Sequence, residues 1–173
     1  MTPRPKGMGA RVGLALAFAL AAAPAAQPAT TGEQAPPCSA VAVDGSQKIN
    51  VADYRGKVVY LDFWASWCAP CRDSFPFMNE LQRDLASKGL QILAVSVDKT
   101  AEDAHRFLER IPAHFTVVLD TVASCPAAYR LQGMPSSYVI DRSGTVRAIH
   151  VGFHNNDREE IRRQVVEMLA GGS

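Results

Sequence analysis

Two cysteines, Cys68 and Cys71, are separated by two residues in the stretch LDFWASWCAPC, directly after a run of apolar residues. Such a pair can bind a metal, cross-link the fold or exchange electrons. A structural zinc site usually needs four ligands at paired spacings, and neither the other two cysteines nor the four histidines have such a spacing. A disulfide that closes so short a loop adds little stability. The pattern therefore favours thiol–disulfide exchange.

The position of Cys68 suits an attacking thiol. A strand is predicted to end just before it and a helix to begin just after it, with Pro70 in the first turn, where a missing amide hydrogen costs nothing. The free amides and the dipole of a helix N-terminus favour a thiolate and lower the pKa of a cysteine there. Cys71, one turn further on, is the expected resolving thiol, which releases the mixed disulfide that Cys68 forms with a substrate.

Asp62 is the one charged residue in the apolar segment VVYLDFW, residues 58–64. A buried carboxylate without a partner is costly, and desolvation raises its pKa. We therefore expect Asp62 to be a buried proton acceptor for Cys71 in the resolving step. The alternative is an aspartate that turns toward solvent at the end of a strand.

The elements around these residues predict an α/β fold. Buried strands are expected at residues 58–64, 90–97 and 115–120, and helices at 69–88, from Thr100, near 126–131 and from Asp157. One hairpin around Asp44 and Gly45 precedes them, and a second joins SSYVID to TVRAIHVGF. This order predicts a central mixed sheet with helices on both faces and with Cys68 at the carboxyl ends of the parallel strands.

The first residues predict an exported chain. Basic residues precede an apolar run of about 15 residues that ends in Ala-Pro-Ala, which is typical of a signal peptide and short for a membrane-spanning helix. We expect residues 1–26 to be a signal peptide cleaved near Ala25 or Ala26, residues 27–37 a flexible lead-in, and residues 38–173 one domain in the periplasm, where disulfides persist. An uncleaved membrane anchor is the alternative.

Composition says little about partners. The chain has 18 Lys and Arg against 17 Asp and Glu, a formal net charge of +1, and no basic stripe is visible. Nucleic acid is therefore not an expected partner.

The stretch LDFWASWCAPC resembles the active-site strand and motif of the thioredoxin superfamily. Trp64 and Trp67 precede the first cysteine, Pro76 lies where the family has a kinking proline, and GMPSS matches the family's cis-proline turn. The export signal, the Cys-Ala-Pro-Cys sequence and an extra helix and strand between residues 97 and 120 make the chain similar to the periplasmic TlpA/ResA-like thiol-disulfide oxidoreductases. The resemblance runs over residues 38–169.

The resemblance implies a thioredoxin-like fold with an N-terminal β-hairpin and an extra helix–strand insertion. It also implies that the bond before Pro135 is cis, which leaves the backbone of Met134 free to pair with a substrate peptide, and that Trp67 lies beside the disulfide on the docking surface. Without the Cys-x-x-Cys pair, Pro135 would be interpreted as the start of an edge strand. Asp62 matches the buried acid of thioredoxins, where many TlpA-like proteins have a neutral residue.

By this resemblance, the chain is a reductant of disulfides in exported proteins, such as apocytochrome c or copper-site proteins, which uses no cofactor and is re-reduced by a membrane thiol-disulfide donor. Ala-Pro between the cysteines lacks the histidine of strong dithiol oxidants, although a dithiol oxidant or isomerase is an alternative. A peroxiredoxin-type peroxidase needs Thr or Ser three residues before its reactive cysteine, and this chain has Ala65 there. A non-catalytic binding module or metal chaperone of the same fold is a further alternative.

Cys38 and Cys125 remain. In an exported protein two further thiols often pair, and Cys125 follows the third strand at the same edge of the sheet as Cys68. The two residues could form a structural disulfide that closes a long loop, remain free buried thiols, or regulate the protein. The family pattern does not contain this pair, so the resemblance does not decide among these alternatives.

Overall fold

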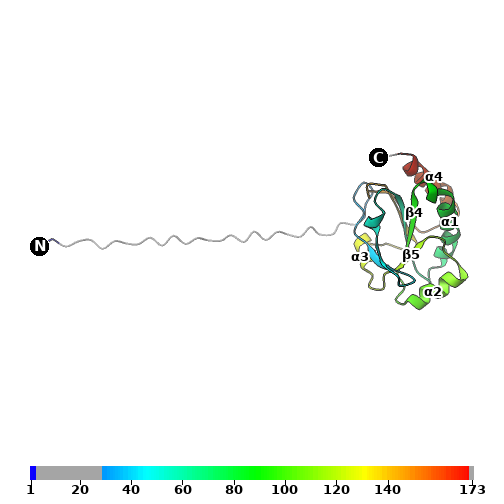
Figure 1. Ribbon diagram of the computed structural model, residues 1–173, viewed down its shortest axis with the longest axis horizontal. Helices are drawn as coiled ribbons and strands as arrows, with labels where there is room; N and C mark the ends of the chain where they lie inside the picture. The colour runs from blue at the N-terminus through cyan, green and yellow to red at the C-terminus, as the bar shows by residue number, and fades with distance from the viewer. Residues whose placement is uncertain (3–28, 172–173) are drawn as a thin grey trace.

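The computed structural model describes residues 1–2 and 29–171, so the predicted signal peptide, apart from its first two residues, lies outside the described part (Figure 1). The strands are β1 (Ser39–Ala42), β2 (Lys48–Asn50), β3 (Val58–Trp64), β4 (Leu90–Ser96), β5 (Thr116–Leu119), β6 (Ser136–Ile140) and β7 (Val146–Val151). The α-helices are α1 (Ala69–Leu85), α2 (Ala101–Arg110), α3 (Ser124–Tyr129) and α4 (Asp157–Ala170), with short 3-10 helices η1 (Val51–Tyr54) and η2 (Ala86–Lys88). Within the described residues, no helix has the length and apolar character needed to cross a membrane.

The strands form one mixed sheet in the order β2-β1-β5-β4-β3-β6-β7. Strands β3, β4 and β5 are parallel neighbours, whereas β6 pairs antiparallel with β3 and with β7. All residues of the central strand β3 are buried, as its continuous apolar sequence predicts. The predicted α/β fold with a central mixed sheet and an N-terminal hairpin is therefore confirmed.

Helices cover both faces of the sheet. Helices α1, α2 and α4 lie on one face, and α3 lies on the other (Figure 1). Side chains alternate along a strand, so Tyr60 and Trp64 join the apolar cluster under α1, while Leu61 and Phe63 join the cluster that includes α3. By the same alternation, Asp62 lies on the α1 face.

Helix α1 begins at the turn that follows β3. Cys68 is its N-cap residue, and a proline stands in its first turn. The helix buries an inward face of aromatic and aliphatic side chains, namely Phe75, Phe77, Met78, Leu81 and Leu85. It ends through η2 at Gly89, whose φ of 102° suits glycine. The start of α1 therefore places the cysteine pair at the carboxyl edge of the sheet.

The segment predicted to be a flexible lead-in makes backbone contacts with the domain. The Gly32 amide donates to the Val146 carbonyl at 2.8 Å, the Val146 amide donates to the Glu33 carbonyl at 2.8 Å, and the Ala35 amide donates to the Gly144 carbonyl at 2.9 Å. The interactions of the domain thus begin before Cys38. Composition does not reveal these three bonds because the backbone makes them; the Gln34 side chain adds bonds to Thr145 and Arg55.

Candidate active site

Cys68 and Cys71 form a disulfide at the N-terminus of α1, with their Cα atoms 5.4 Å apart. Cys68 is 5% exposed, whereas Cys71 is completely buried. An incoming thiolate must approach a sulfur directly, and of the two residues only Cys68 keeps some exposed surface. The first amides of a helix have no intrahelical partner, and Cys68 stands next to them. Of the two cysteines, Cys68 is therefore the more exposed and the nearer to the free amides of α1.

Asp62 is a buried carboxyl with an incomplete set of partners. It is 1% exposed, and its Oδ2 makes no hydrogen bond within the part of the chain that the structure describes. Its neighbours across the sheet are Ala94 on β4 and Ser137 on β6. The Ser137 hydroxyl is engaged by Tyr60, whose hydroxyl donates to it at 2.9 Å. Burial raises the pKa of the Asp62 carboxyl well above its usual value.

The loop before β6 brings Met134 and Pro135 to the same edge. Their peptide bond is cis, and Met134 packs against the apolar cluster that contains both cysteines of the disulfide. The Pro135 carbonyl accepts a hydrogen bond from the Gly152 amide at 2.7 Å. Among the described residues, the backbone N–H and C=O of Met134 have no hydrogen-bond partner.

Two large apolar side chains are exposed, one next to Cys68 and one opposite the start of β6. Trp67, next to Cys68, is 69% exposed, and Val151, which pairs with the first residue of β6, is 59% exposed. Trp64 is different because it is fully buried, with its ring centroid 4.9 Å from that of Phe75. Trp67 thus offers apolar contact area next to Cys68, and Val151 offers it opposite the residue that follows Pro135.

Sequence reasoning did not single out Asp98, the second residue after β4. Its carboxylate accepts hydrogen bonds from the Ser66 amide and from the Ser66 hydroxyl, two residues before Cys68. One signal could have identified it: Asp98 is a carboxylate at the carboxyl end of a buried strand, on the edge where Cys68 was predicted to lie.

The other two cysteines lie away from this site. Cys38 and Cys125 form a second disulfide, with Cα atoms 4.8 Å apart, and no free cysteine remains in the described residues. Both are buried in the apolar cluster on the α3 face, whereas Cys68 and Cys71 belong to the cluster on the α1 face. The second disulfide therefore links the start of β1 to α3 and takes no part in the candidate site.

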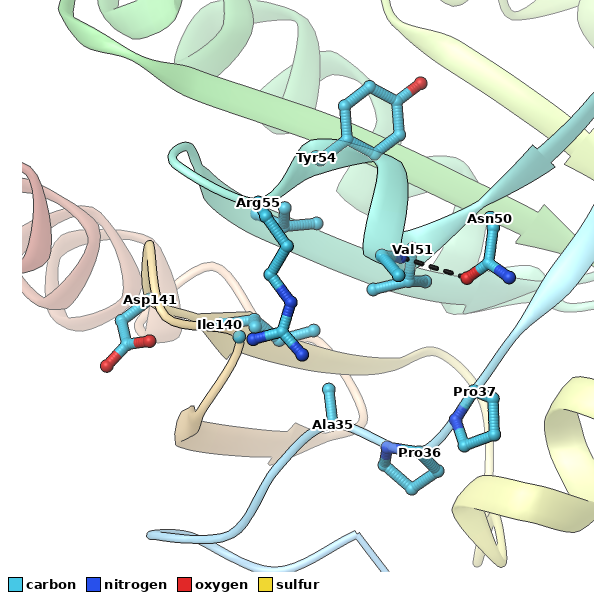
Figure 2. A pocket seen from close by; sticks show the side chains of 12 residues that line it. Ala35, Pro36, Pro37, Asn50, Val51, Tyr54, Arg55, Ile140 and Asp141 are labelled. Carbon is cyan, nitrogen blue, oxygen red and sulfur yellow. Dashed lines mark hydrogen bonds between the residues drawn. The ribbon is translucent and has the colours of Figure 1, made fainter.

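A pocket of about 270 Å³ lies at the opposite edge of the sheet (Figure 2). It is lined by residues of the lead-in, of η1 and of the β6–β7 turn, among them Ala35, Arg55 and Asp141. Val59 at the start of β3 and Ile140 at the end of β6 also line it. No cysteine lines this pocket, and it is separate from the disulfide.

Comparisons with known proteins agree with this geometry. A family model described as Redoxin matches residues 30–165. The thiol-disulfide oxidoreductase ResA of Geobacillus kaustophilus is 36% identical over 115 residues, which cover 66% of this chain and 65% of ResA. The thioredoxin-like protein YneN of Bacillus subtilis is 36% identical over 124 residues, which cover 70% of this chain and 71% of YneN. A crystal structure described as the thiol:disulfide interchange protein DsbE of Chlorobium tepidum has a TM-score of 0.78 at 43% identity, with 81% of this chain and 98% of that chain covered.

Proposed function

Because the chain belongs to the Redoxin family and has its thioredoxin-like fold, we propose that it is a thiol-disulfide oxidoreductase that reduces disulfides in exported proteins. The observation that supports this most directly is the arrangement of the Cys68–Cys71 disulfide. Cys68, at the helix N-terminus, is 5% exposed, and Cys71, one turn further along, is completely buried. A purely structural cross-link would gain little from so short a loop.

In the proposed reaction, the reduced protein gives two electrons to its substrate. The Cys68 thiolate attacks one sulfur of the substrate disulfide, whose S–S bond breaks, and the departing substrate thiolate takes up a proton. The Cys71 thiol then loses its proton, and its thiolate attacks the Cys68 sulfur. The mixed disulfide breaks, the second substrate thiolate leaves and is protonated, and the Cys68–Cys71 disulfide forms.

We propose that the Asp62 carboxylate accepts the proton that the Cys71 thiol loses. Its carboxyl lies on the α1 face of β3, the face on which Cys71 is buried. Its burial raises the pKa well above the usual value, so this carboxyl binds a proton more tightly than an exposed aspartate does. The unpaired Oδ2 is the free acceptor that this step requires.

We further propose that substrates bind as an extended segment beside Met134. The free N–H and C=O of Met134 can pair with a substrate backbone as one strand pairs with another. The exposed Trp67 and Val151 supply apolar contacts on either side. Such a surface fits a protein substrate that brings its own disulfide to Cys68. The proposed substrates are apocytochrome c, copper-site proteins or other exported proteins.

The proposed direction of electron flow is toward the substrate, with a membrane thiol-disulfide donor that restores the dithiol. The residues between the cysteines are Ala69 and Pro70, and strong oxidants stabilise their reduced form by additional interactions there. The redox potential of the Cys68/Cys71 couple, measured against glutathione, should therefore lie below about −180 mV. A higher potential would contradict a reducing role in the periplasm.

Insulin reduction by the purified domain tests the activity itself. The wild-type protein should precipitate insulin chains in the presence of dithiothreitol, and Cys68→Ser should abolish this. Cys71→Ser should instead accumulate mixed disulfides with cell-envelope proteins, since the resolving thiol is missing. A wild-type protein that leaves insulin intact, or a Cys71→Ser variant that traps nothing, would refute the proposal.

A further inference from the structure

Asp98 carries a buried carboxylate that is held by hydroxyl and amide groups. It is 2% exposed, and none of the ion pairs among the described residues includes it. The Ser66 amide donates to Oδ2 at 3.0 Å, the Ser66 hydroxyl donates to Oδ1 at 2.9 Å, and the Ser96 hydroxyl donates to Oδ2 at 2.9 Å. A buried carboxylate requires such donors, and two of the three come from Ser66.

Ser66 belongs to the turn that ends in Cys68. The Cys68 amide donates to the Ala65 carbonyl at 3.0 Å and closes this turn over four residues. Cys68 then serves as the N-cap of α1. The position of the reactive sulfur relative to the first amides of α1 therefore depends on the turn that Asp98 holds.

Asp98 is itself rigidly placed. The Val97 amide donates to the Trp64 carbonyl at 2.9 Å, so the pairing of β3 with β4 extends as far as the residue before Asp98. The Asp98 amide donates to the Ser96 hydroxyl at 3.1 Å. The carboxylate thus connects the fixed end of β4 to the turn that follows β3.

We propose that Asp98 is a positioning residue for the Cys68 thiol, which it keeps against the N-terminal amides of α1. This proposal rests on the thiol–disulfide exchange proposed above. In the oxidised protein the bond to Cys71 also restrains Cys68. In the reduced protein that bond is gone, and the hydrogen bonds between Asp98 and the turn become the main restraint on Cys68. The effect of Asp98 is therefore greatest in the reduced, attacking form.

The thiol pKa measures this role without any substrate. In a Cys71→Ser background, Cys68 is the single thiol outside the Cys38–Cys125 disulfide, so its alkylation by iodoacetamide can be followed against pH. Asp98→Ala should raise the pKa of Cys68, because the thiolate moves away from the helix amides. We expect alkylation at pH 7 to slow by about tenfold. Asp98→Asn, which keeps one acceptor oxygen, should give a smaller effect in the same direction.

With both cysteines present, the dithiol–disulfide equilibrium gives an independent readout. Loss of a restraint that favours the reduced form should shift the equilibrium with glutathione toward the Cys68–Cys71 disulfide in Asp98→Ala. Asp120→Ala is the matched control. Asp120 is also buried, at 3% exposure, and follows β5. Its carboxylate accepts from the Cys125 amide at 2.7 Å and from the Ser124 hydroxyl, so it holds α3. Among the described residues, none of its side-chain hydrogen bonds involves the Cys68 turn. Its loss should lower the melting temperature and leave the thiol pKa unchanged.

Two results would overturn the proposal. An unchanged Cys68 pKa in Asp98→Ala, with a melting temperature lowered as in Asp120→Ala, would reduce Asp98 to a structural role. A lowered Cys68 pKa would mean that Asp98 acts through its charge and not by position. If Asp98→Ala does not fold, Ser66→Ala decides the question, since it removes only the 2.9 Å hydroxyl bond. Ser66→Ala should slow alkylation about two- to threefold, and Ser66→Thr should restore the wild-type rate; an unchanged rate in Ser66→Ala would refute the proposal.

The alkylation measurements need no turnover. A wild-type protein that failed to reduce insulin would therefore count against the proposed function. The alkylation measurement would still decide whether Asp98 positions the Cys68 thiol.

Discussion

Replacement of Asp62 by asparagine should stabilise the oxidised protein at neutral and higher pH. Asp62 is 1% exposed, its Oδ2 is unpaired within the described residues, and burial raises its pKa. At low pH the carboxyl is protonated, and asparagine has nearly the same shape and no charge. At high pH the wild-type protein must bury a carboxylate that the variant does not have.

The sign of the pH dependence follows from proton binding. The native state holds the Asp62 proton more tightly than the unfolded chain does, because the native pKa is raised above the unfolded value of 3.8. The contribution of Asp62 to the free energy of unfolding is therefore fully present below the unfolded pKa and is lost as pH rises through the native pKa. Asparagine does not titrate, so the advantage of Asp62→Asn should grow across that window and then level off.

The size of this effect on the free energy of unfolding can be estimated from the unpaired Oδ2 of Asp62. An unpaired buried acceptor costs about 1–3 kcal/mol, and more when it is charged. We expect Asp62→Asn to gain at least about 2 kcal/mol more at pH 8 than at pH 4. The same variant should release its mixed disulfide more slowly, because Cys71 has lost its proton acceptor.

Urea unfolding of the oxidised protein at pH 4, 6 and 8, followed by tryptophan fluorescence, gives the free energy of unfolding at each pH. Asp73→Asn is a matched control, since Asp73 is exposed on the same helix that carries Cys71, and it should stay within about 0.5 kcal/mol of the wild type at each pH. A difference between Asp62→Asn and wild type that is the same at all three pH values would refute this reasoning.

Two further predictions concern the second disulfide and the docking surface. The Cys38→Ala, Cys125→Ala double variant should lose about 4–5 kcal/mol of unfolding free energy in urea, because the disulfide joins residues 87 apart. It should still reduce insulin at the wild-type rate. A loss below about 1 kcal/mol would mean that the loop is restrained without the disulfide. Trp67→Ala should lower kcat/KM for insulin reduction. It should change the free energy of unfolding by less than about 0.5 kcal/mol, since Trp67 is 69% exposed. An unchanged kcat/KM would show that Trp67 does not contact the substrate.

Much of the fold could be predicted because single elements have strong local signals. The continuous apolar run at residues 58–64 forms β3 with the predicted bounds, and Thr100 caps α2 with its side chain, as its place before Asp103 predicts. The burial of Asp62 could be predicted as well, since a lone carboxyl in a buried strand has few alternatives.

Other features depend on backbone geometry that no local pattern encodes. Helix α3 spans Ser124–Tyr129 and so begins and ends earlier than predicted. Its two flanking residues, Ala123 and Arg130, adopt positive φ angles of 56° and 48°, and these end the helix. Neither residue is a glycine, so the sequence does not suggest such angles there. Most of the lead-in contacts are made by backbone groups, and the side-chain bonds of Gln34 join it to residues far along the chain, Arg55 and Thr145. The bonds from Asp98 to Ser66 join residues 32 apart, and only the pairing of β3 with β4 brings them together.

The positions of the two disulfides on opposite faces of one sheet have a consequence for assembly of the chain. Four cysteines can pair in three ways, and a thiolate can exchange only with a disulfide that it can approach in line. Once β3 has joined the sheet, the sheet lies between the Cys38–Cys125 and Cys68–Cys71 disulfides and separates them. In the proposed reaction, the Cys68–Cys71 disulfide can therefore open and form again without exchange with Cys38–Cys125, which lies on the other face of the sheet.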